Sequence, residues 1–225
     1  MSDVRAEEGD RSVRLTASNI GVRIGDRTVL AGVNLRATPG RILCVTGPAG
    51  SGKTTLLHVL AGIIGPDEGE VTVEDGTKIE KDSKATHLGF VPQTFGLAAS
   101  LTVAENIALP LQLLRLPRDE VARRVEVNLE EIGLDNASEQ LSTELSGGQQ
   151  QRTAVGRAIV AEPALIIADE PTSELDAASR DLVFDLLERA AGRGATVIVA
   201  THDPELVERC DDVLRLHDGR VVGEA

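Results

Sequence analysis

The sequence has no tryptophan, no tyrosine and only three phenylalanines among its 225 residues. Proteins that bind single-stranded nucleic acid commonly stack the bases on aromatic rings, and this chain has few rings to offer. Positive charge is also scarce, because 23 Lys and Arg stand against 36 Asp and Glu, which gives a net charge of -13. Since phosphate backbones are bound by basic surfaces, we expect no direct contact with nucleic acid.

Cysteine and long apolar runs are nearly absent as well. The two cysteines, Cys44 and Cys210, each lie in or beside an apolar stretch, which favours buried thiols in a reducing compartment over a disulfide framework. No apolar run of the sequence approaches the ~18 residues that a membrane-spanning helix needs. Residues 1–12 mix both charges without an apolar segment and predict a disordered tail rather than a signal peptide. We therefore expect one cytoplasmic domain over residues 13–225.

Short apolar runs dominate the first part of that domain. Residues 13–35 contain such runs, broken at Gly25-Asp26 and at Gly32. This pattern predicts two or three strands of an antiparallel layer. Residues 70–79 alternate between polar and apolar up to a turn signal at Asp75-Gly76, and we expect them to join the same layer.

Three other apolar stretches do not alternate. Residues 41–47, 164–169 and 196–202 read RILCVTG, ALIIAD and TVIVATH, which predicts strands buried on both faces of a parallel sheet. Helical spacing follows the first of them at 54–62, and a second helix at about 177–191 separates the other two. The order strand, helix, strand indicates an α/β protein with a mostly parallel sheet.

Residues 96–160 differ from the rest because they carry several helix signals and almost no β-branched runs. Thr102 and Glu105 have the spacing of a capping box. An apolar helical face ends at Gly133, and its members are Val121, Val125, Leu129 and Ile132. We therefore expect a helical insertion subdomain at about 96–160.

The eight residues 47–54 read GPAGSGKT and run from a predicted strand into a predicted helix. The glycines let the backbone curl so that successive N–H groups point inward, and the helix adds its positive end. Lys53 is placed to bridge the β- and γ-phosphates, and the hydroxyl of Thr54 to ligate Mg²⁺. The sequence therefore predicts a P-loop that holds a nucleotide.

Two further stretches carry polar residues at element boundaries. Asp169 ends ALIIAD, where it could hold the water shell of a metal, and Glu170 could orient or deprotonate an attacking water. Taken alone, these acids could instead cap the next helix. In LSGGQQQR (145–152) Ser146 is a natural N-cap, and the glycines after it leave N–H groups bare. This predicts a second phosphate-binding helix start, without a lysine.

In this order the motifs resemble those of the ATP-binding-cassette ATPases, over residues 13–223. The likeness adds Gln93 in FVPQ as the Q-loop, residues 173–176 (SELD) as the D-loop and His202 as the switch histidine. It implies a RecA-like P-loop NTPase fold, with an N-terminal antiparallel β layer and a helical insertion. It also implies a homodimer or a cassette heterodimer in which each ATP is enclosed by the P-loop of one subunit and the signature stretch of the other.

The resemblance also implies ATP and Mg²⁺ as ligands and gives each motif residue a role. Glu170, His202 and Gln93 are expected to be catalytic. The expected metal ligands are Thr54, Gln93 and Asp169. The expected nucleotide contacts are Gly47, Pro48, Ala49, Gly50, Ser51, Gly52, Lys53, Thr54, Thr55, Ser146, Gly147, Gly148 and Gln149.

The sequence departs from that family where an aromatic residue usually stacks on adenine. Val22 or Ile24 would offer an aliphatic surface instead, which predicts weaker affinity and looser discrimination against GTP. A smaller departure is Glu174 in the D-loop, where alanine or asparagine is more common.

The region 95–114 looks most like the cassettes that power lipoprotein release and macrolide efflux. Its apolar residues exceed what a small helical insert needs, and two explanations stay open: a groove for a short helix of a membrane partner, or a wholly internal cluster. These residues are Phe95, Leu97, Leu101, Leu109, Leu111 and Leu114.

The leading functional hypothesis is the ATP-hydrolysing subunit of a transporter, bound at the inner face of the cell membrane to a separate integral membrane permease. Two alternatives stay open. One is a soluble cassette that acts on DNA or ribosomes, and the other is an ATP-driven transmembrane switch that moves no solute.

Overall fold

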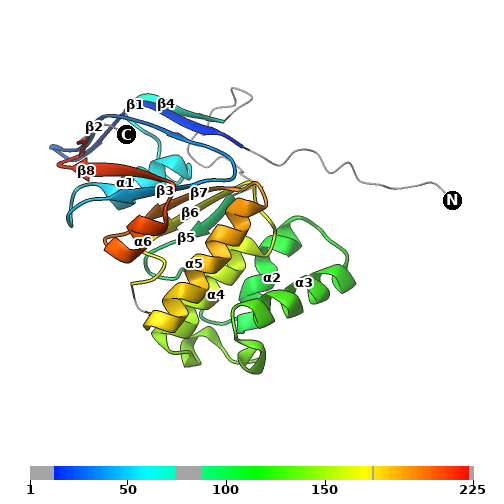
Figure 1. The fold of residues 1–225 in the computed structure, drawn as a ribbon. Helices are drawn as coiled ribbons and strands as arrows, with labels where there is room; N and C mark the ends of the chain where they lie inside the picture. Colours follow the sequence, from blue (N-terminus) through cyan, green and yellow to red (C-terminus); the bar gives the residue numbers. More distant parts are fainter. Residues whose placement is uncertain (1–12, 74–87, 174, 223–225) are drawn as a thin grey trace.

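The computed structural model describes residues 13–73, 88–173 and 175–222 (Figure 1). Its first layer is a three-stranded antiparallel sheet in the order β2-β1-β4. The strands are β1 (Leu15–Ile24), β2 (Arg27–Ala37) and β4 (Glu68–Val73). The predicted antiparallel layer is thereby confirmed, whereas the tail at 1–12 and the turn at Asp75-Gly76 lie outside the described residues.

The two sequence breaks in this layer have different outcomes. Gly25-Asp26 forms the turn between β1 and β2, as predicted, but a strand end at Gly32 is wrong. Gly32 lies inside β2 with a φ of 67°, where the pairing with β1 shifts in register. Because glycine adopts this left-handed conformation without a Cβ clash, the strand continues through a bulge.

The second layer is a six-stranded sheet in the order β5-β6-β7-β3-β8-β9. Neighbouring strands pair in parallel except for β8 and β9, which are antiparallel. The strands are β3 (Ile42–Thr46), β5 (Leu88–Val91), β6 (Leu165–Asp169), β7 (Thr196–Ala200), β8 (Asp212–His217) and β9 (Arg220–Val221). The mostly parallel α/β core is confirmed.

Helices cover both faces of the central sheet, as its non-alternating strands require. Along β6, Leu165 and Ile167 face one core cluster, and the residues between and after them face the other. Helix α1 (Lys53–Leu60) packs in the cluster shared with the antiparallel sheet. Helices α4 (Gly147–Ile159) and α5 (Ala177–Gly192) pack in the opposite cluster (Figure 1). The central sheet therefore separates α1 from α4.

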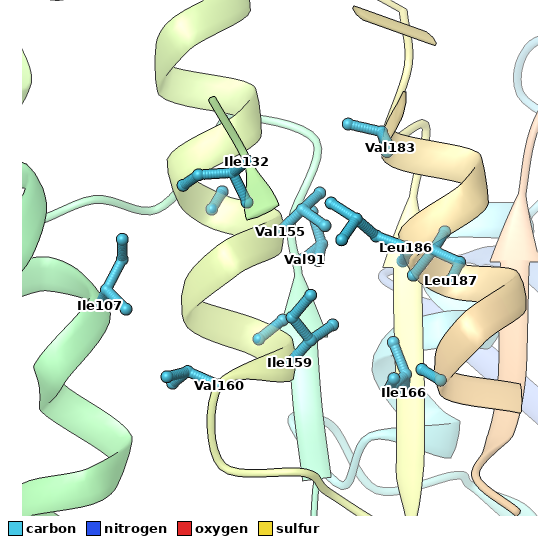
Figure 2. Close-up of a cluster of buried hydrophobic side chains, with 14 of the residues drawn as sticks. Val91, Ile107, Ile132, Val155, Ile159, Val160, Ile166, Val183, Leu186 and Leu187 are labelled. Carbon is cyan, nitrogen blue, oxygen red and sulfur yellow. The ribbon is translucent and has the colours of Figure 1, made fainter. Parts of the chain in front are cut away.

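A group of helices extends from the α4 side. It contains α2 (Val103–Leu113) and α3 (Arg118–Glu131), and the 3₁₀ turns η1 (Asp135–Ala137) and η2 (Ser142–Glu144) lead from α3 to α4. Figure 2 shows Ile107 of α2 and Val155 of α4 in one buried cluster with Ile132, which caps α3. The predicted capping box is confirmed, since Thr102 and Glu105 each accept the other's backbone N–H.

The apolar residues of 95–114 are divided between core and surface. Leu111 is fully buried, Phe95 and Leu97 are partly buried against the core, and Leu114 is 37% exposed. An internal cluster thus explains part of the set, and the groove stays a prediction. In the described parts of the chain, no helix combines the length and apolar character that crossing a membrane requires.

No pattern noted in the sequence predicts β5, β8 or β9. β5 has four residues, one of which is Gly89, packed so that a Cβ would lie 2.3 Å from the Ala158 carbonyl oxygen. β8 buries Leu214 and Leu216 alternately, a period of two that the stretch DVLRLH does contain.

Candidate functional site

Four loops leave the central sheet at one edge. β5, β6, β7 and β3 are neighbours that run in parallel, and their register places their carboxyl ends level. The P-loop follows β3, Gln93 follows β5, Asp169 and Glu170 end β6, and His202 follows β7. Open parallel sheets bind ligands beyond the carboxyl ends of their strands. The structure therefore brings these sequence-predicted residues to the expected edge.

The P-loop between β3 and α1 turns on glycines. Gly50 and Gly52 have φ values of 75° and 104°, which disfavour any side chain. A Cβ on Gly47 would lie 2.1 Å from the carbonyl oxygen of Leu216. Gly52 is the N-cap of α1, and the first turn of that helix has no acidic residue. Because no side chain caps them, the first N–H groups of α1 are available to an anion.

Lys53 bends back over this loop. Its Nζ donates hydrogen bonds to the carbonyl oxygens of Gly47 at 2.8 Å and Pro48 at 3.3 Å. Ser51 is buried in the same turn. Its hydroxyl oxygen is also buried and has no hydrogen-bond partner in the described parts of the chain. A pocket of about 250 Å³ opens beside Lys53 and is lined by Gly50, Gly52, Lys53, Thr54, Thr55, Arg27 and Val29. Five of the predicted loop residues thus share this pocket with two β2 residues that sequence motifs did not indicate, whereas Gly47, Pro48, Ala49 and Ser51 do not line it.

The two aliphatic candidates for contact with the base separate clearly. Val22 is only 4% exposed and belongs to the core below the antiparallel sheet, so its proposed contact with adenine is wrong. Ile24 is 62% exposed at the end of β1 and is paired with Arg27 across the turn. Of these two residues, Ile24 is the one that can offer the expected aliphatic surface.

Asp169 is a buried carboxylate at the end of β6. It is 1% exposed, and both of its carboxylate oxygens lack a hydrogen-bond partner among the described residues. Burial is the main cause that raises the pKa of Asp169, and the negative charge of Glu170 adds to it, while nearby Thr54 and Lys53 oppose it. An unpaired buried carboxylate beside a hydroxyl is the hard oxygen donor set that suits Mg²⁺.

Glu170 and His202 are in direct contact. Glu170 is 8% exposed and has a φ of 49°, a left-handed conformation that is uncommon outside glycine. Its N–H donates to the carbonyl oxygen of Ala200 at 2.9 Å. The His202 side chain is 72% exposed, and its Nδ1–H donates to Glu170 Oε1 at 2.9 Å. The geometry therefore joins two residues that the resemblance assigned separately.

An ion pair holds the loop that bears His202. The next residue, Asp203, is the N-cap of α6 (Pro204–Arg209), as its side chain accepts the N–H of Glu205 at 3.0 Å. Its other oxygen accepts from Arg180 Nη1 on α5 at 2.9 Å. α5 begins directly after the D-loop stretch, in which Glu174 lies outside the described residues. Arg180 therefore connects the start of α5 to the His202 loop.

A second arginine holds the loop after β5. Gln93 is exposed there, and Arg157 of α4 donates to the carbonyl oxygens of Gly96 at 2.6 Å and Phe95 at 3.0 Å. Burial lowers the pKa of Arg157, yet a guanidinium stays charged at neutral pH. The α4 helix is thus tied to the segment that carries Gln93. Sequence motifs gave no sign of this role because it depends on a contact 61 residues away.

The signature stretch begins α4 as predicted. Ser146 Oγ accepts the N–H of Gln149 at 3.3 Å, and Gln149 Oε1 accepts the N–H of Ser146 at 2.9 Å, which completes a capping box. Within the described ranges, the N–H groups of Gly147 and Gly148 have no partner. None of these four residues lines the P-loop pocket. The two predicted phosphate sites are therefore separate within one chain.

The fold and this edge define a class of protein: an α/β P-loop protein with a buried carboxylate for a cation and a Glu170–His202 pair for hydrolysis. The family model described as ABC transporter matches residues 30–173. The ABC transporter ATP-binding protein YtrE of Bacillus subtilis is 37% identical, with 87% of each chain covered. The lipoprotein-releasing system ATP-binding protein LolD of Aquifex aeolicus is also 37% identical, over 93% of this chain and 96% of its own.

Solved structures with a similar fold agree with this family match. A dimeric post-hydrolysis state of an ATP-binding cassette bound to ADP and Pi has a TM-score of 0.87 and 31% identity, and it covers 94% of this chain and 97% of its own. A second dimeric structure of the same cassette, described as a bacterial ABC transporter cassette, gives a TM-score of 0.86 and 32% identity with the same coverage. This chain therefore belongs to the ABC transporter family and is an ATP-binding and ATP-hydrolysing subunit.

Proposed function

We propose that the chain uses ATP binding and hydrolysis, as a dimer of two cassettes, to drive a separate integral membrane permease. The observation that supports this best is the meeting of Lys53, Asp169, Glu170 and His202 at one sheet edge. Similar proteins are named for lipoprotein release and for bacitracin export, and both names describe ATP-binding proteins. We expect the chain to lie at the inner face of the cell membrane, attached through that permease.

The P-loop residues 47–55 would hold the phosphates of ATP. Lys53 would exchange the carbonyl oxygens of Gly47 and Pro48, which it now contacts, for phosphate oxygens. Thr54, Gln93 and Asp169 would hold Mg²⁺, because the buried oxygens of Asp169 have no hydrogen-bond partner among the described residues and suit a hard cation. A bound Mg²⁺ neutralises charge on the β- and γ-phosphates.

Glu170 would orient or deprotonate the attacking water, and His202 would contact the γ-phosphate. A neutral imidazole that donates from Nδ1 can only accept at Nε2, so it cannot also donate to a phosphate in this arrangement. We therefore propose that His202 leaves Glu170 when ATP binds. That movement gives His202 an N–H for the phosphate and frees Glu170 Oε1 for the water.

The position of the signature stretch supports the dimer. Ser146, Gly147, Gly148 and Gln149 begin a helix on the face of the central sheet opposite to α1. We propose that they contact the γ-phosphate held by the P-loop of another cassette. Cleavage would then remove the anion that joins the two chains, and the dimer would open.

The organisation proposed for the chain is a tail at 1–12 and a single nucleotide-binding domain at 13–225. Within it, residues 96–160 would form a helical subdomain that receives the permease. The relatives and structures reported above do not favour the soluble cassette, and nothing observed favours a switch without transport.

The experiment that tests the catalytic assignment is Glu170→Gln. We expect turnover to fall at least about 100-fold, since general-base catalysis is lost, while ATP binding and a stable ATP-bound dimer persist. Glu126→Gln removes an exposed carboxylate on α3 and is the matched control, with unchanged turnover. Turnover and size-exclusion chromatography with ATP measure both effects. Normal turnover in Glu170→Gln would contradict the role of Glu170.

The partner is tested separately by purifying the tagged chain from native membranes in mild detergent. Mass spectrometry should find a stoichiometric protein with several membrane spans. Ribosomal or DNA-bound partners instead would support the soluble alternative.

A further inference from the structure

The P-loop pocket has a second wall that no nucleotide motif supplies. One side is formed by Gly50, Gly52 and the start of α1, and the other by Arg27 and Val29 at the beginning of β2. The bare helix start and Lys53 fix the phosphate end of a nucleotide. If the site binds a nucleotide as proposed above, its base extends from the phosphates toward this β2 wall.

No phenylalanine, tyrosine or tryptophan ring is available to cover the base there. The sequence has no Tyr or Trp, and all three phenylalanines are engaged elsewhere. Phe90 lies 5.8 Å from the ring of His58, Phe184 is buried beneath the guanidinium of Arg209, and Phe95 packs against the core near α4. None of them lines the pocket. The contact to the base must come from other side chains.

Arg27 has the properties that such a contact requires. It is exposed, and it has no hydrogen bond or ion pair from its side chain anywhere in residues 13–73, 88–173 and 175–222. Its neighbour across the β1–β2 turn is Ile24, which is 62% exposed, and Val29 follows it along β2 in the pocket wall. A guanidinium is planar and weakly hydrated, so it stacks on flat π-systems, whereas a lysine ammonium does not.

We propose that Arg27 is the base-binding residue of this site, and that its guanidinium stacks on the purine while Ile24 and Val29 supply the aliphatic remainder of the platform. Stacking contacts the π-face, which adenine and guanine share. Discrimination between them needs hydrogen bonds to the groups that differ, and the polar lining residues Lys53, Thr54 and Thr55 lie at the phosphate end. The site therefore takes both purine nucleotides with similar affinity.

The test measures dissociation constants by calorimetry for ADP, GDP and inorganic pyrophosphate. The diphosphates occupy the P-loop without the γ-phosphate that the proposed dimer needs, so binding is not coupled to dimerisation. Arg27→Ala should weaken ADP and GDP about fivefold each and pyrophosphate by less than about twofold. Arg27→Lys should behave like Arg27→Ala, because it keeps the charge but loses the plane.

Arg23→Ala is the matched control, since it removes an exposed cation of β1 that does not line the pocket. It should change each affinity by less than about twofold. An equal loss for pyrophosphate in Arg27→Ala would overturn the proposal, because Arg27 would then act on phosphate. So would unchanged affinities, or a wild-type preference for either purine above about tenfold. Absence of any nucleotide binding would overturn the proposed function as well, whereas normal binding with unaffected Arg27 variants would leave it intact.

Discussion

Two helices of this fold begin with glycine-rich sequences, and they begin differently. The N-cap of α1 is Gly52, which has no side chain to cap the helix, and the adjacent Lys53 is folded onto loop carbonyls. The N-cap of α4 is Ser146, whose capping box with Gln149 satisfies the N–H of Gln149. One helix start is positively charged and lacks a cap, and the other is neutral and partly satisfied.

The difference shows how one chain can hold two unequal phosphate sites. An uncapped helix start with a lysine attracts an anion on its own. A capped start without a lysine is stable when exposed to water, and it offers the N–H groups of Gly147 and Gly148 to an anion. α1 is therefore suited to bind the nucleotide first, and α4 to recognise it only when another chain presents it.

The difference between the two helix starts should be lost most completely if the start of α1 loses its positive charge. Lys53→Ala should weaken ATP binding by about 100-fold or more, because a charge-assisted contact to the phosphates disappears. It should also prevent ATP-dependent dimers. Calorimetry and size-exclusion chromatography measure the two effects. Arg36→Ala on β2, which removes an exposed cation outside the pocket, should leave both unchanged. If Lys53→Ala bound ATP normally, the helix start alone would be sufficient.

The substitution Asp169→Asn tests whether the site at the start of α1 contains a buried charge without a partner among the described residues. The pKa of Asp169 in the folded protein is raised above its ordinary value of 3.8. At a pH above this folded-state pKa, the ionised carboxylate therefore lowers the stability of the fold. This destabilisation disappears as the pH falls below the pKa of Asp169 in the unfolded chain. We expect Asp169→Asn to abolish turnover and to raise Tm at pH 7 by about 2–4 °C, with the gain fading in acid.

The control for this prediction is Asp212, whose pKa is shifted in the opposite direction. Arg41 lowers the pKa of exposed Asp212, so the ionised form of Asp212 stabilises the fold and Asp212→Asn should not raise Tm. Thermal unfolding across pH measures both variants. A lower Tm for Asp169→Asn at pH 7 would show that Asp169 is paired within the chain.

The α4 start is tested by Ser146→Ala. Loss of an N-cap costs about 1 kcal/mol locally, and we expect ATP-dependent dimerisation and turnover to fall about tenfold while ADP binding by the monomer is unchanged. Thr102→Ala removes an equivalent capping box from α2 and is the structural control, with turnover retained. Equal effects of the two variants would mean that Ser146 acts only through helix stability.

The smallest effect is expected from the Arg180–Asp203 ion pair beside His202. Arg180→Ala should slow turnover about threefold without changing ATP affinity, because a partly exposed pair contributes modestly. Arg41→Ala breaks a comparable pair away from the site and should leave turnover unchanged. A change in ATP affinity rather than in turnover would show that Arg180 does not act by positioning His202.

The sequence predicted those parts of the site whose chemistry is local. A P-loop, an acidic strand end and an N-cap are each set by a few neighbouring residues, so GPAGSGKT, Asp169 and Ser146 could be located before any fold was known. The strands buried on both faces were equally legible because apolar runs such as ALIIAD do not alternate.

Features that depend on register or on distant contacts were not predictable. Val22 and Ile24 have the same parity on β1, yet one is in the core and the other is exposed at a hairpin end. The bulge at Gly32 follows from pairing with β1 and not from the local sequence. The position of Arg27 in the pocket wall likewise depends on the place of β2 beside the P-loop.

Through Arg157, helix α4 connects two parts of the proposed dimer. Ser146 is the N-cap of this helix, and Arg157 near its other end donates to the segment that follows Gln93. In the proposed dimer, Gln93 faces the chain's own nucleotide and Ser146 faces the neighbour's. A single rigid helix would thus report on both sites at once. Occupancy becomes a property of the pair, and we expect turnover to depend cooperatively on ATP concentration.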